Sequence, residues 1–166
     1  MKIDIKALPQ NFDDIPAGTF FKVMRSEPFF GLSVIDSQGK KAAILFVKVP
    51  QQTSVPWLAE RGLPHDVLAT FPDAVIHAEA SAISEPTNGI PYGAILSTSK
   101  GFYIRAGAGI GYSMIFNLDT GQPETISDSD KPMLVYERWS IGHRVGNEIE
   151  PIFDYPLRAK NQREPT

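Results

Sequence analysis

The sequence predicts a mainly β fold, an antiparallel β-barrel or β-sandwich with one short helical excursion at about residues 54–71. Two neighbouring segments predict it most clearly, because their apolar residues alternate with other residues in the pattern of half-buried strands. In the first segment, Phe102, Ile104 and Ala106 share one face. In the second, four residues share one face: Ile110, Tyr112, Met114 and Phe116. The 14 prolines of the chain agree with short strands and many corners.

Three further strands are expected before this pair. They span 18–24, 29–35 and 41–49 and are rich in the aromatic and β-branched residues that favour strands. The break Glu27-Pro28 and the turn 36–39 separate them. The third segment is apolar on both faces, which is typical of a strand in the middle of a sheet. Together the three segments predict a meander.

Residues 54–71 carry helix signals instead. Ser54 is a suitable N-cap, Pro56 fits the first turn of a helix, and Gly62 suits the residue that ends one. Phe71-Pro72 would stop a second short turn. We therefore expect this segment to be helical and to pack on the sheet.

The rest of the chain predicts strands joined by polar loops. Strands are expected at 75–79, 133–141 and 149–155, the last of them at a sheet edge because prolines keep it short. The turn formers in 81–91 and the polar run 122–132 predict loops.

Length and composition predict one domain at 1–157, followed by a disordered tail at 158–166. A chain of this size can bury roughly 70% of the surface that it exposes when unfolded, so its core needs no disulfide or metal. The absence of cysteine excludes disulfides, thiol nucleophiles and cysteine-ligated metal sites. The interleaved charges of the N-terminus do not match a secretory signal, and no segment approaches the ~20 apolar residues of a membrane span. We expect a cytoplasmic protein that does not enter a membrane.

The charge of the chain argues against nucleic acid as a partner. The formal net charge is -3, and the only adjacent basic pair is Lys40-Lys41. Binding to a phosphate backbone requires clustered lysine and arginine. An acidic protein with polar loops suits a partner with a basic surface.

A glycine cluster invites comparison with phosphate-binding loops. Gly107, Gly109 and Gly111 follow a predicted strand, but the third glycine of the dinucleotide pattern is missing and a strand follows where a helix is required. A tight turn or β-bulge is the alternative interpretation, and we prefer it. No cofactor is expected.

The few histidines allow only a weak metal hypothesis. His77 and Glu79 would leave the same face of a strand, and His143 could add a third ligand from elsewhere. The run 77–79 also resembles the zinc-deaminase signature, but that family requires two downstream cysteines that this chain lacks. Incidental polar residues on a surface strand are the alternative, and we expect no metal.

The sequence contains no complete motif for nucleophilic catalysis. The run 111–113 approaches the Gly-x-Ser-x-Gly elbow, but Met114-Ile115 breaks it. The adjacent pair His65-Asp66 cannot align as base and orienting acid. Catalytic triads whose residues come from distant parts of a chain are recognised by their geometry. An enzyme therefore stays an open alternative, although the sequence argues against it.

Glu137 is the acidic residue of most interest. It lies in register with four apolar residues of its predicted strand: Met133, Val135, Trp139 and Ile141. A carboxylate on an apolar face must be paired, raised in pKa or placed at the mouth of a pocket. Arg105 and Arg138 are the candidate partners. The alternative is a register break that leaves Glu137 in solvent.

Aromatic residues are dense in the predicted strands. They can form the core, line a ligand cavity or make a protein-binding face. The set comprises Phe20, Phe21, Phe29, Phe30, Tyr103, Tyr112, Tyr136 and Trp139. If a ligand pocket exists, we expect four residues to contribute to it: Glu137, Arg105, Tyr112 and Tyr103.

The layout of 17–21, 29–34 and 42–46 resembles the opening of small SH3-like barrel modules and of some bacterial toxin-immunity proteins. The resemblance carries over no functional residue. With no cofactor motif or catalytic set, our first hypothesis is a non-catalytic module that recognises a protein partner, as an immunity- or inhibitor-type protein does. The alternative is a small-molecule-binding barrel or enzyme with a pocket near Glu137 and Arg105. Pairing of an edge strand with its twin would give a homodimer.

Overall fold

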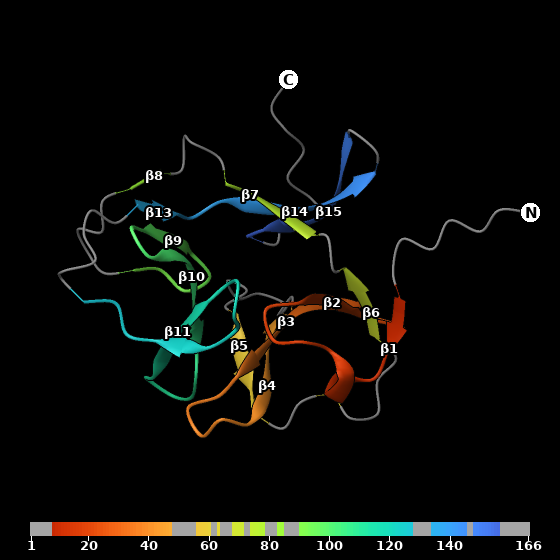
Figure 1. Ribbon diagram of the computed structural model, residues 1–166, viewed down its shortest axis with the longest axis horizontal. Coiled ribbons are helices and arrows are strands. Elements are labelled where there is room, and N and C mark those ends of the chain that lie inside the picture. The colour runs from red at the N-terminus through yellow and green to blue at the C-terminus, as the bar shows by residue number, and fades with distance from the viewer. Residues whose placement is uncertain are drawn as a thin grey trace, which may run out of the picture.

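The computed structural model describes residues 8–47, 56–60, 63, 68–71, 74–78, 83–84, 90–127, 134–145 and 148–156. Within these ranges the protein is mainly β, with its strands arranged as two sheets and with one short 3-10 turn, η1 (Phe12–Asp14). The predicted fold class is therefore confirmed. Neither sheet closes into a barrel among the described strands, and the sandwich is the alternative that fits (Figure 1).

The larger sheet has twelve strands in the described part of the chain. Ten of them follow the order β1-β6-β2-β3-β4-β5-β10-β9-β13-β8, while β11 pairs with β10 and β12 with β11. The N-terminal members are β1 (Leu8–Gln10), β2 (Phe20–Val23), β3 (Phe29–Ile35), β4 (Lys41–Phe46), β5 (Trp57–Ala59) and β6 (Leu68–Phe71). The others are β8 (Ile83–Ser84), β9 (Ile95–Thr98), β10 (Gly101–Gly107), β11 (Ser113–Asn117), β12 (Pro123–Glu124) and β13 (Leu134–Tyr136).

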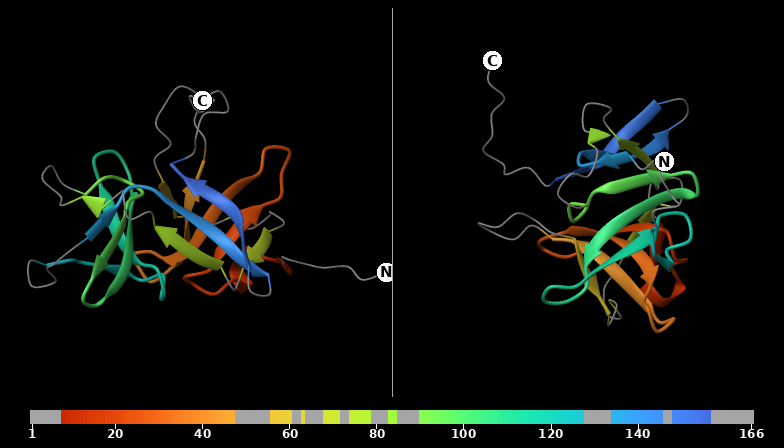
Figure 2. Two further views of the ribbon diagram at one scale, coloured as in Figure 1. Left: turned by 90° about the horizontal axis from the view of Figure 1, so that it is seen from above. Right: turned by 90° about the vertical axis from the view of Figure 1, so that its left-hand side faces the viewer.

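Three of the described strands form the smaller sheet, in the order β15-β14-β7. They are β7 (Ala74–Ala78), β14 (Trp139–Val145) and β15 (Glu148–Tyr155). Figure 2 shows from two sides that these strands lie across one face of the larger sheet. One core cluster contains residues of both sheets, among them Phe20, Phe46, Trp139 and Phe153, so the main core lies between the two layers.

The larger sheet joins two antiparallel meanders along a short parallel seam. Strands β2 to β5 form the first meander and β9 to β12 the second. β9 follows the edge of β10 as far as Ile95, opposite Ile104, and the chain before it turns away at Gly93. β5 then takes over that edge, with Trp57 opposite Gly107 and the Gly107 amide donating to the Pro56 carbonyl at 2.9 Å. The turn at Gly93 therefore creates the place that β5 fills.

A second, smaller core covers the other face of the first meander. η1 lies on that face and buries Phe12 against Phe21, with the ring centroids 5.8 Å apart. The Lys41 ammonium donates to the carbonyls of Asp13, at 2.7 Å, and Ile15, and it lies 5.4 Å from the Phe12 ring centroid. Burial lowers the pKa of Lys41, against the raising effect of Asp13 and Asp14. One lysine thus fastens the N-terminal segment to the sheet.

Most strands predicted from the sequence are present with slightly different ends. The segment 29–35 is β3 without change, while 18–24, 41–49, 75–79 and 149–155 correspond to β2, β4, β7 and β15. The segment 110–116 is shorter than predicted, because β11 begins at Ser113, and Ile110 and Tyr112 belong to the preceding turn. The segment 133–141 divides into β13 and β14 at a bend at Glu137. The predicted loops contain the two-residue strands β8 and β12.

The predicted helical excursion at 54–71 is wrong wherever the structure describes it. Trp57–Ala59 and Leu68–Phe71 are strands. β5 pairs with β4, and β6 lies between β1 and β2, so both segments make inter-strand backbone bonds. The helix signals of Ser54, Pro56 and Gly62 are local, and these long-range pairings override them. Ser54 and Gly62, like the predicted tail at 158–166, lie outside the described residues.

Two buried side chains tie the smaller sheet to the turn at Gly93. The Trp139 indole N–H donates to the Gly93 carbonyl at 2.8 Å. The Tyr155 hydroxyl donates to the Tyr92 carbonyl at 2.9 Å. The two rings stack on each other, with centroids 5.1 Å apart. One turn of the larger sheet is thereby held by neighbouring residues of β14 and β15.

Stability at alkaline pH is expected to depend on Tyr155. Burial raises the pKa of Tyr155 from 10.0 to about 12. Between these values the unfolded chain loses a proton that the folded chain keeps, so the free energy of unfolding falls as pH rises through this window. The contribution lost between pH 9 and pH 11.5 is on the order of 2 kcal/mol. Urea unfolding across this range should show a fall in wild type that is steeper by about this amount than in Tyr155→Phe.

Other groups also titrate at high pH, so the test depends on the difference in pH dependence between wild type and Tyr155→Phe. Tyr112→Phe removes a tyrosine that is 75% exposed and serves as the control. It should keep the wild-type dependence on pH. Parallel curves for wild type and Tyr155→Phe would show that this phenol does not govern alkaline stability.

Candidate functional site

The connection between β10 and β11 is a compact turn with glycines at its bends. The Ala108 amide donates to the Tyr112 carbonyl at 3.0 Å, and the Tyr112 amide donates to the Gly109 carbonyl at 3.3 Å. Gly109 and Gly111 have φ values of 122° and 77°, which side chains rarely allow. The glycine cluster thus forms a turn between two strands, as the preferred interpretation predicted.

This turn holds two large apolar side chains in solvent. Ile110 is 97% exposed and Tyr112 is 75% exposed. Trp57, which is 47% exposed, lies beside the base of the turn, because a Cβ added to Gly107 would be 3.1 Å from its ring. Three apolar side chains therefore gather at the end of the β10–β11 hairpin.

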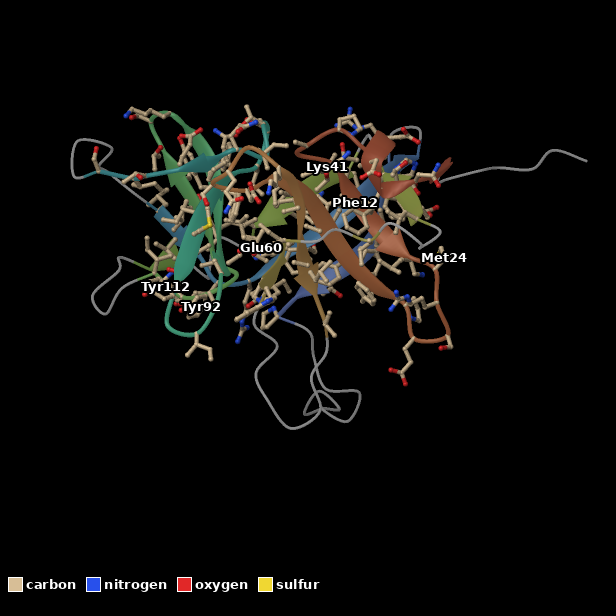
Figure 3. The ribbon with its side chains drawn as sticks, turned by 90° about the horizontal axis from the view of Figure 1, so that it is seen from below. Phe12, Met24, Lys41, Glu60, Tyr92 and Tyr112 are labelled. Carbon is tan, nitrogen blue, oxygen red and sulfur yellow. The ribbon has the colours of Figure 1, made fainter. Side chains whose placement is uncertain are left out.

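Arg105 adds a fixed cation next to this turn. Its Nε donates to the Ser113 hydroxyl at 3.1 Å, and its Nη1 donates to the Ile90 carbonyl. The guanidinium lies 4.6 Å from the centroid of the Tyr92 ring. Figure 3 shows Tyr92 and Tyr112 at the same end of the molecule, far from Met24. We call the set Trp57, Tyr92, Arg105, Ile110 and Tyr112 the hairpin surface.

The structure brings together two of the four predicted site residues. Arg105 donates to the hydroxyl of Ser113, the residue that follows Tyr112, so both predicted residues belong to the β10–β11 hairpin. Tyr103 shares a strand with Arg105 but is only 3% exposed, and it packs in a core cluster with Leu96 and Val135. Glu137 is exposed at the bend between β13 and β14, as its register-break alternative predicted.

Sequence reasoning missed Ile110, Trp57 and Tyr92 as surface residues. Ile110 was assigned to a buried strand face because it alternates with Tyr112 and Met114. The signal that could have corrected this is the glycine on either side of it, since Gly109 and Gly111 favour a turn. Trp57 could not have been placed, because its position depends on the parallel pairing with Gly107.

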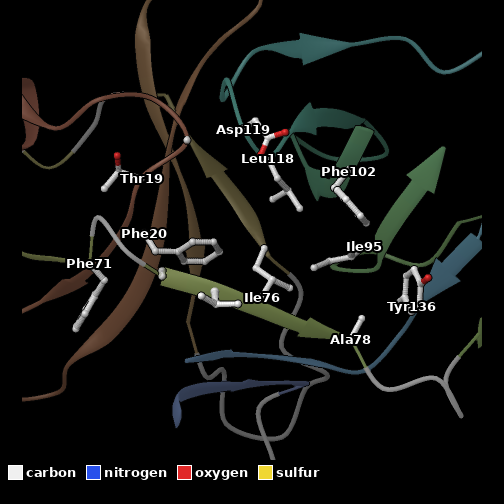
Figure 4. A pocket seen from close by; sticks show the side chains of 13 residues that line it. Thr19, Phe20, Phe71, Ile76, Ala78, Ile95, Phe102, Leu118, Asp119 and Tyr136 are labelled. Atoms are coloured by element: carbon white, nitrogen blue, oxygen red, sulfur yellow. The ribbon is translucent and has the colours of Figure 1, made fainter. Parts of the chain in front are cut away.

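A pocket of about 540 Å³ lies between the two sheets. Figure 4 shows its lining: β7 runs along one side, and residues of the larger sheet stand opposite. Most of the wall is apolar, with the side chains of Phe20, Phe71, Ile76, Ile95, Phe102 and Leu118. The polar side chains are Thr19, Asp119 and Tyr136.

None of the four predicted site residues lines this pocket. Phe102 does, and residues 103 and 105 do not, because alternate side chains of β10 leave opposite faces of the sheet. Tyr136 also lines the pocket, whereas its neighbour Glu137 does not. The pocket thus lies on the other face of β10 from Arg105.

The described residues contain no group of three His, Asp or Glu side chains placed to hold a metal ion. His77 is exposed on β7, and the His143 ring centroid lies 6.5 Å from that of Phe71. His65 and Glu79 lie outside the described ranges. The described part of the chain also holds no helix with the length and apolar character to cross a membrane.

The hairpin surface and the pocket are therefore the two features from which a function can be argued. Both are defined by this chain's own geometry. Comparison of the chain with models of protein families, with curated proteins and with solved structures gives no match.

Proposed function

We propose that this protein is a non-catalytic, cytoplasmic interaction module that recognises a protein partner through the hairpin surface. The observation that carries the proposal is the exposure of Ile110 and Tyr112, 97% and 75%, on a turn closed by two backbone hydrogen bonds. Burying these side chains in a partner would remove apolar area from water, at roughly 25 cal/mol per Å².

The composition of the hairpin surface supports this proposal. Tryptophan, tyrosine and arginine are the residues most enriched among those that dominate the energy of protein interfaces. The hairpin surface consists of a tryptophan, two tyrosines, an arginine and one isoleucine. An isoleucine that projects from a turn suits an apolar socket on the partner, and the aromatic rings would surround that contact and exclude water.

The rigidity of the site also favours binding. Arg105 is held by Ser113, by the Ile90 carbonyl and by the Tyr92 ring, so little of its side-chain freedom remains to be lost when a partner binds. The turn itself is fixed on two paired strands. An inhibitor- or immunity-type protein acts by covering a partner surface in this manner, without chemistry of its own.

Ile110→Asp should weaken recognition of the partner while leaving the fold intact. The substitution places a charge where the partner's apolar socket must close, and the side chain makes no core contact to lose. We expect the affinity to fall at least tenfold, about 1.4 kcal/mol. The measurement is capture from a lysate of the source cells with tagged wild type and variant, followed by titration of the purified partner.

Met24→Asp is the matched control, because Met24 is also an exposed apolar residue, at 53%, and lies away from the hairpin surface. It should capture the same stoichiometric partner as wild type. A partner that Ile110→Asp retains at full affinity would overturn the proposal. So would a wild-type protein that captures no stoichiometric partner at all.

A further inference from the structure

The pocket between the sheets exists because β7 carries small side chains where its neighbours carry large ones. β14 and β15 place Trp139, Phe153 and Tyr155 against the larger sheet, and their rings fill the space between the layers. β7 is one of the two edge strands of the same sheet and lines the pocket with Ala74, Val75, Ile76 and Ala78. Two alanines cannot span a gap that aromatic rings fill further along, so about 540 Å³ stays open.

The walls of this pocket are already in place without a ligand. Phe20 and Ile95 are 5% and 2% exposed and belong to the main core. On the side of Asp119, the Gly18 amide donates to the Ser33 carbonyl at 2.7 Å, and the Gly121 amide donates to the Asn117 carbonyl at 2.9 Å. The pocket therefore has a fixed shape, as small-molecule sites usually do.

One wall shows apolar surface that a ligand would cover. Phe102 is 51% exposed, although Leu118, whose amide donates to the Phe102 carbonyl, and Ile95 on β9 are buried. It lines the pocket opposite β7 (Figure 4). A volume of this size falls within the range of roughly 300–1,000 Å³ that is typical of ligand pockets. A mainly apolar wall with a few polar groups is also typical of such pockets.

The polar groups restrict the chemical class of the ligand. Among the described residues of the lining, Asp119 is the only one with a charged side chain, and no lysine or arginine is among them. A carboxylate accepts hydrogen bonds and attracts cations, so it favours a ligand group that donates or carries positive charge. The Thr19 and Tyr136 hydroxyls can each donate or accept. An anionic ligand would meet the like charge of Asp119 and no cationic side chain among the described residues of the lining.

We propose that this pocket binds a small, mainly apolar molecule that carries an amine or another hydrogen-bond donor, with its apolar body against Phe20, Ile76 and Phe102 and its donor toward Asp119. The site is separate from the hairpin surface, and no residue is shared between them. Binding here therefore stands or fails independently of protein recognition.

The test uses a neutral fluorescent probe, N-phenyl-1-naphthylamine, and three competitors of equal chain length, decylamine, decanol and decanoate, below their micelle concentrations. Wild type should bind the probe saturably, and decylamine should displace it at a concentration at least tenfold lower than decanoate. Asp119→Asn should remove most of that difference. Absence of saturable binding, or displacement by decanoate as readily as by decylamine, would overturn the proposal.

Two substitutions locate the binding in the pocket. Ala78→Trp fills the pocket from β7 and should weaken probe binding at least tenfold, while His77→Trp on the same strand should not, because His77 is exposed and lies outside the lining. Phe102→Ala removes the exposed wall without adding bulk and should weaken binding severalfold. Equal probe affinity in Ala78→Trp, Phe102→Ala and His77→Trp would show that the probe binds elsewhere.

Discussion

Trp139→Ala should lower the free energy of unfolding by about 3–5 kcal/mol, the range found for large aromatic residues removed from cores. Trp139 is 2% exposed and lies at the centre of the core between the sheets. Its ring contacts residues of both layers, with centroid distances of 5.6 Å to Phe46 and 5.7 Å to Phe153. Alanine leaves a cavity that both layers line. Urea unfolding followed by circular dichroism measures the change.

Trp139→Phe separates packing from hydrogen bonding. It keeps a ring in the core but leaves the Gly93 carbonyl without the donor that now lies 2.8 Å away, which costs on the order of 1–3 kcal/mol. Trp57→Ala is the control, because Trp57 is 47% exposed and contributes little to the core. A loss in Trp139→Ala no larger than in Trp57→Ala would contradict the role given to Trp139 in joining the layers.

Gly93→Ala should be nearly as damaging, although it adds only one methyl group. Gly93 has a φ of 77°, a conformation that costs other residues about 1–2 kcal/mol. The added Cβ would also lie 2.2 Å from the Tyr155 hydroxyl oxygen and 2.3 Å from the ring carbon that bears it. Overpacking of this kind costs typically 1–3 kcal/mol more. Chemical denaturation should show a total loss of about 2–5 kcal/mol.

Gly39 offers a matched control, since its φ is 76° and nothing lies within 4 Å of an added Cβ. Gly39→Ala should show the backbone cost alone. In a Tyr155→Leu background the clash is relieved, and the effect of Gly93→Ala should fall toward that of Gly39→Ala. Equal losses for the two glycine substitutions in the wild-type background would show that Tyr155 does not constrain the turn.

Local pattern was sufficient to predict the strands whose side chains alternate clearly. β3 was predicted without error because its run 29–35 ends at a strong turn, and that turn is fixed by backbone bonds to the Asp36 carboxylate from Gln38 and Lys40. β5 and β6 were not predicted, because three or four residues give no period, and because both partners of β6 and the β10 partner of β5 lie far away in the sequence. The structure of β5 and β6 depends on the strands with which they pair, and the local sequence does not indicate those partners.

The two candidate sites differ in how far a sequence can indicate them. Arg105 and Tyr112 were predicted as site residues, and the structure brings them together at the hairpin surface. Glu137 was singled out because a continuous strand was assumed, and the bend that places it in solvent removes the reason. The pocket could not be predicted from the sequence. The alanines of β7 leave a cavity only because the aromatic side chains of β14 and β15 hold the two sheets apart.

The parallel seam between β5 and β10 has a consequence for how the molecule folds. Each meander is built from hairpins between neighbouring strands, whose closure costs little chain entropy. The seam joins Trp57 to Gly107, which are far apart in the sequence, and contacts of this kind slow folding. Formation of the seam also requires both meanders, because β4 positions β5 and the edge of β10 is free only where β9 has ended. We therefore expect the seam to form after both meanders, and protection of the Gly107 amide from hydrogen exchange would report when the two halves of the sheet unite.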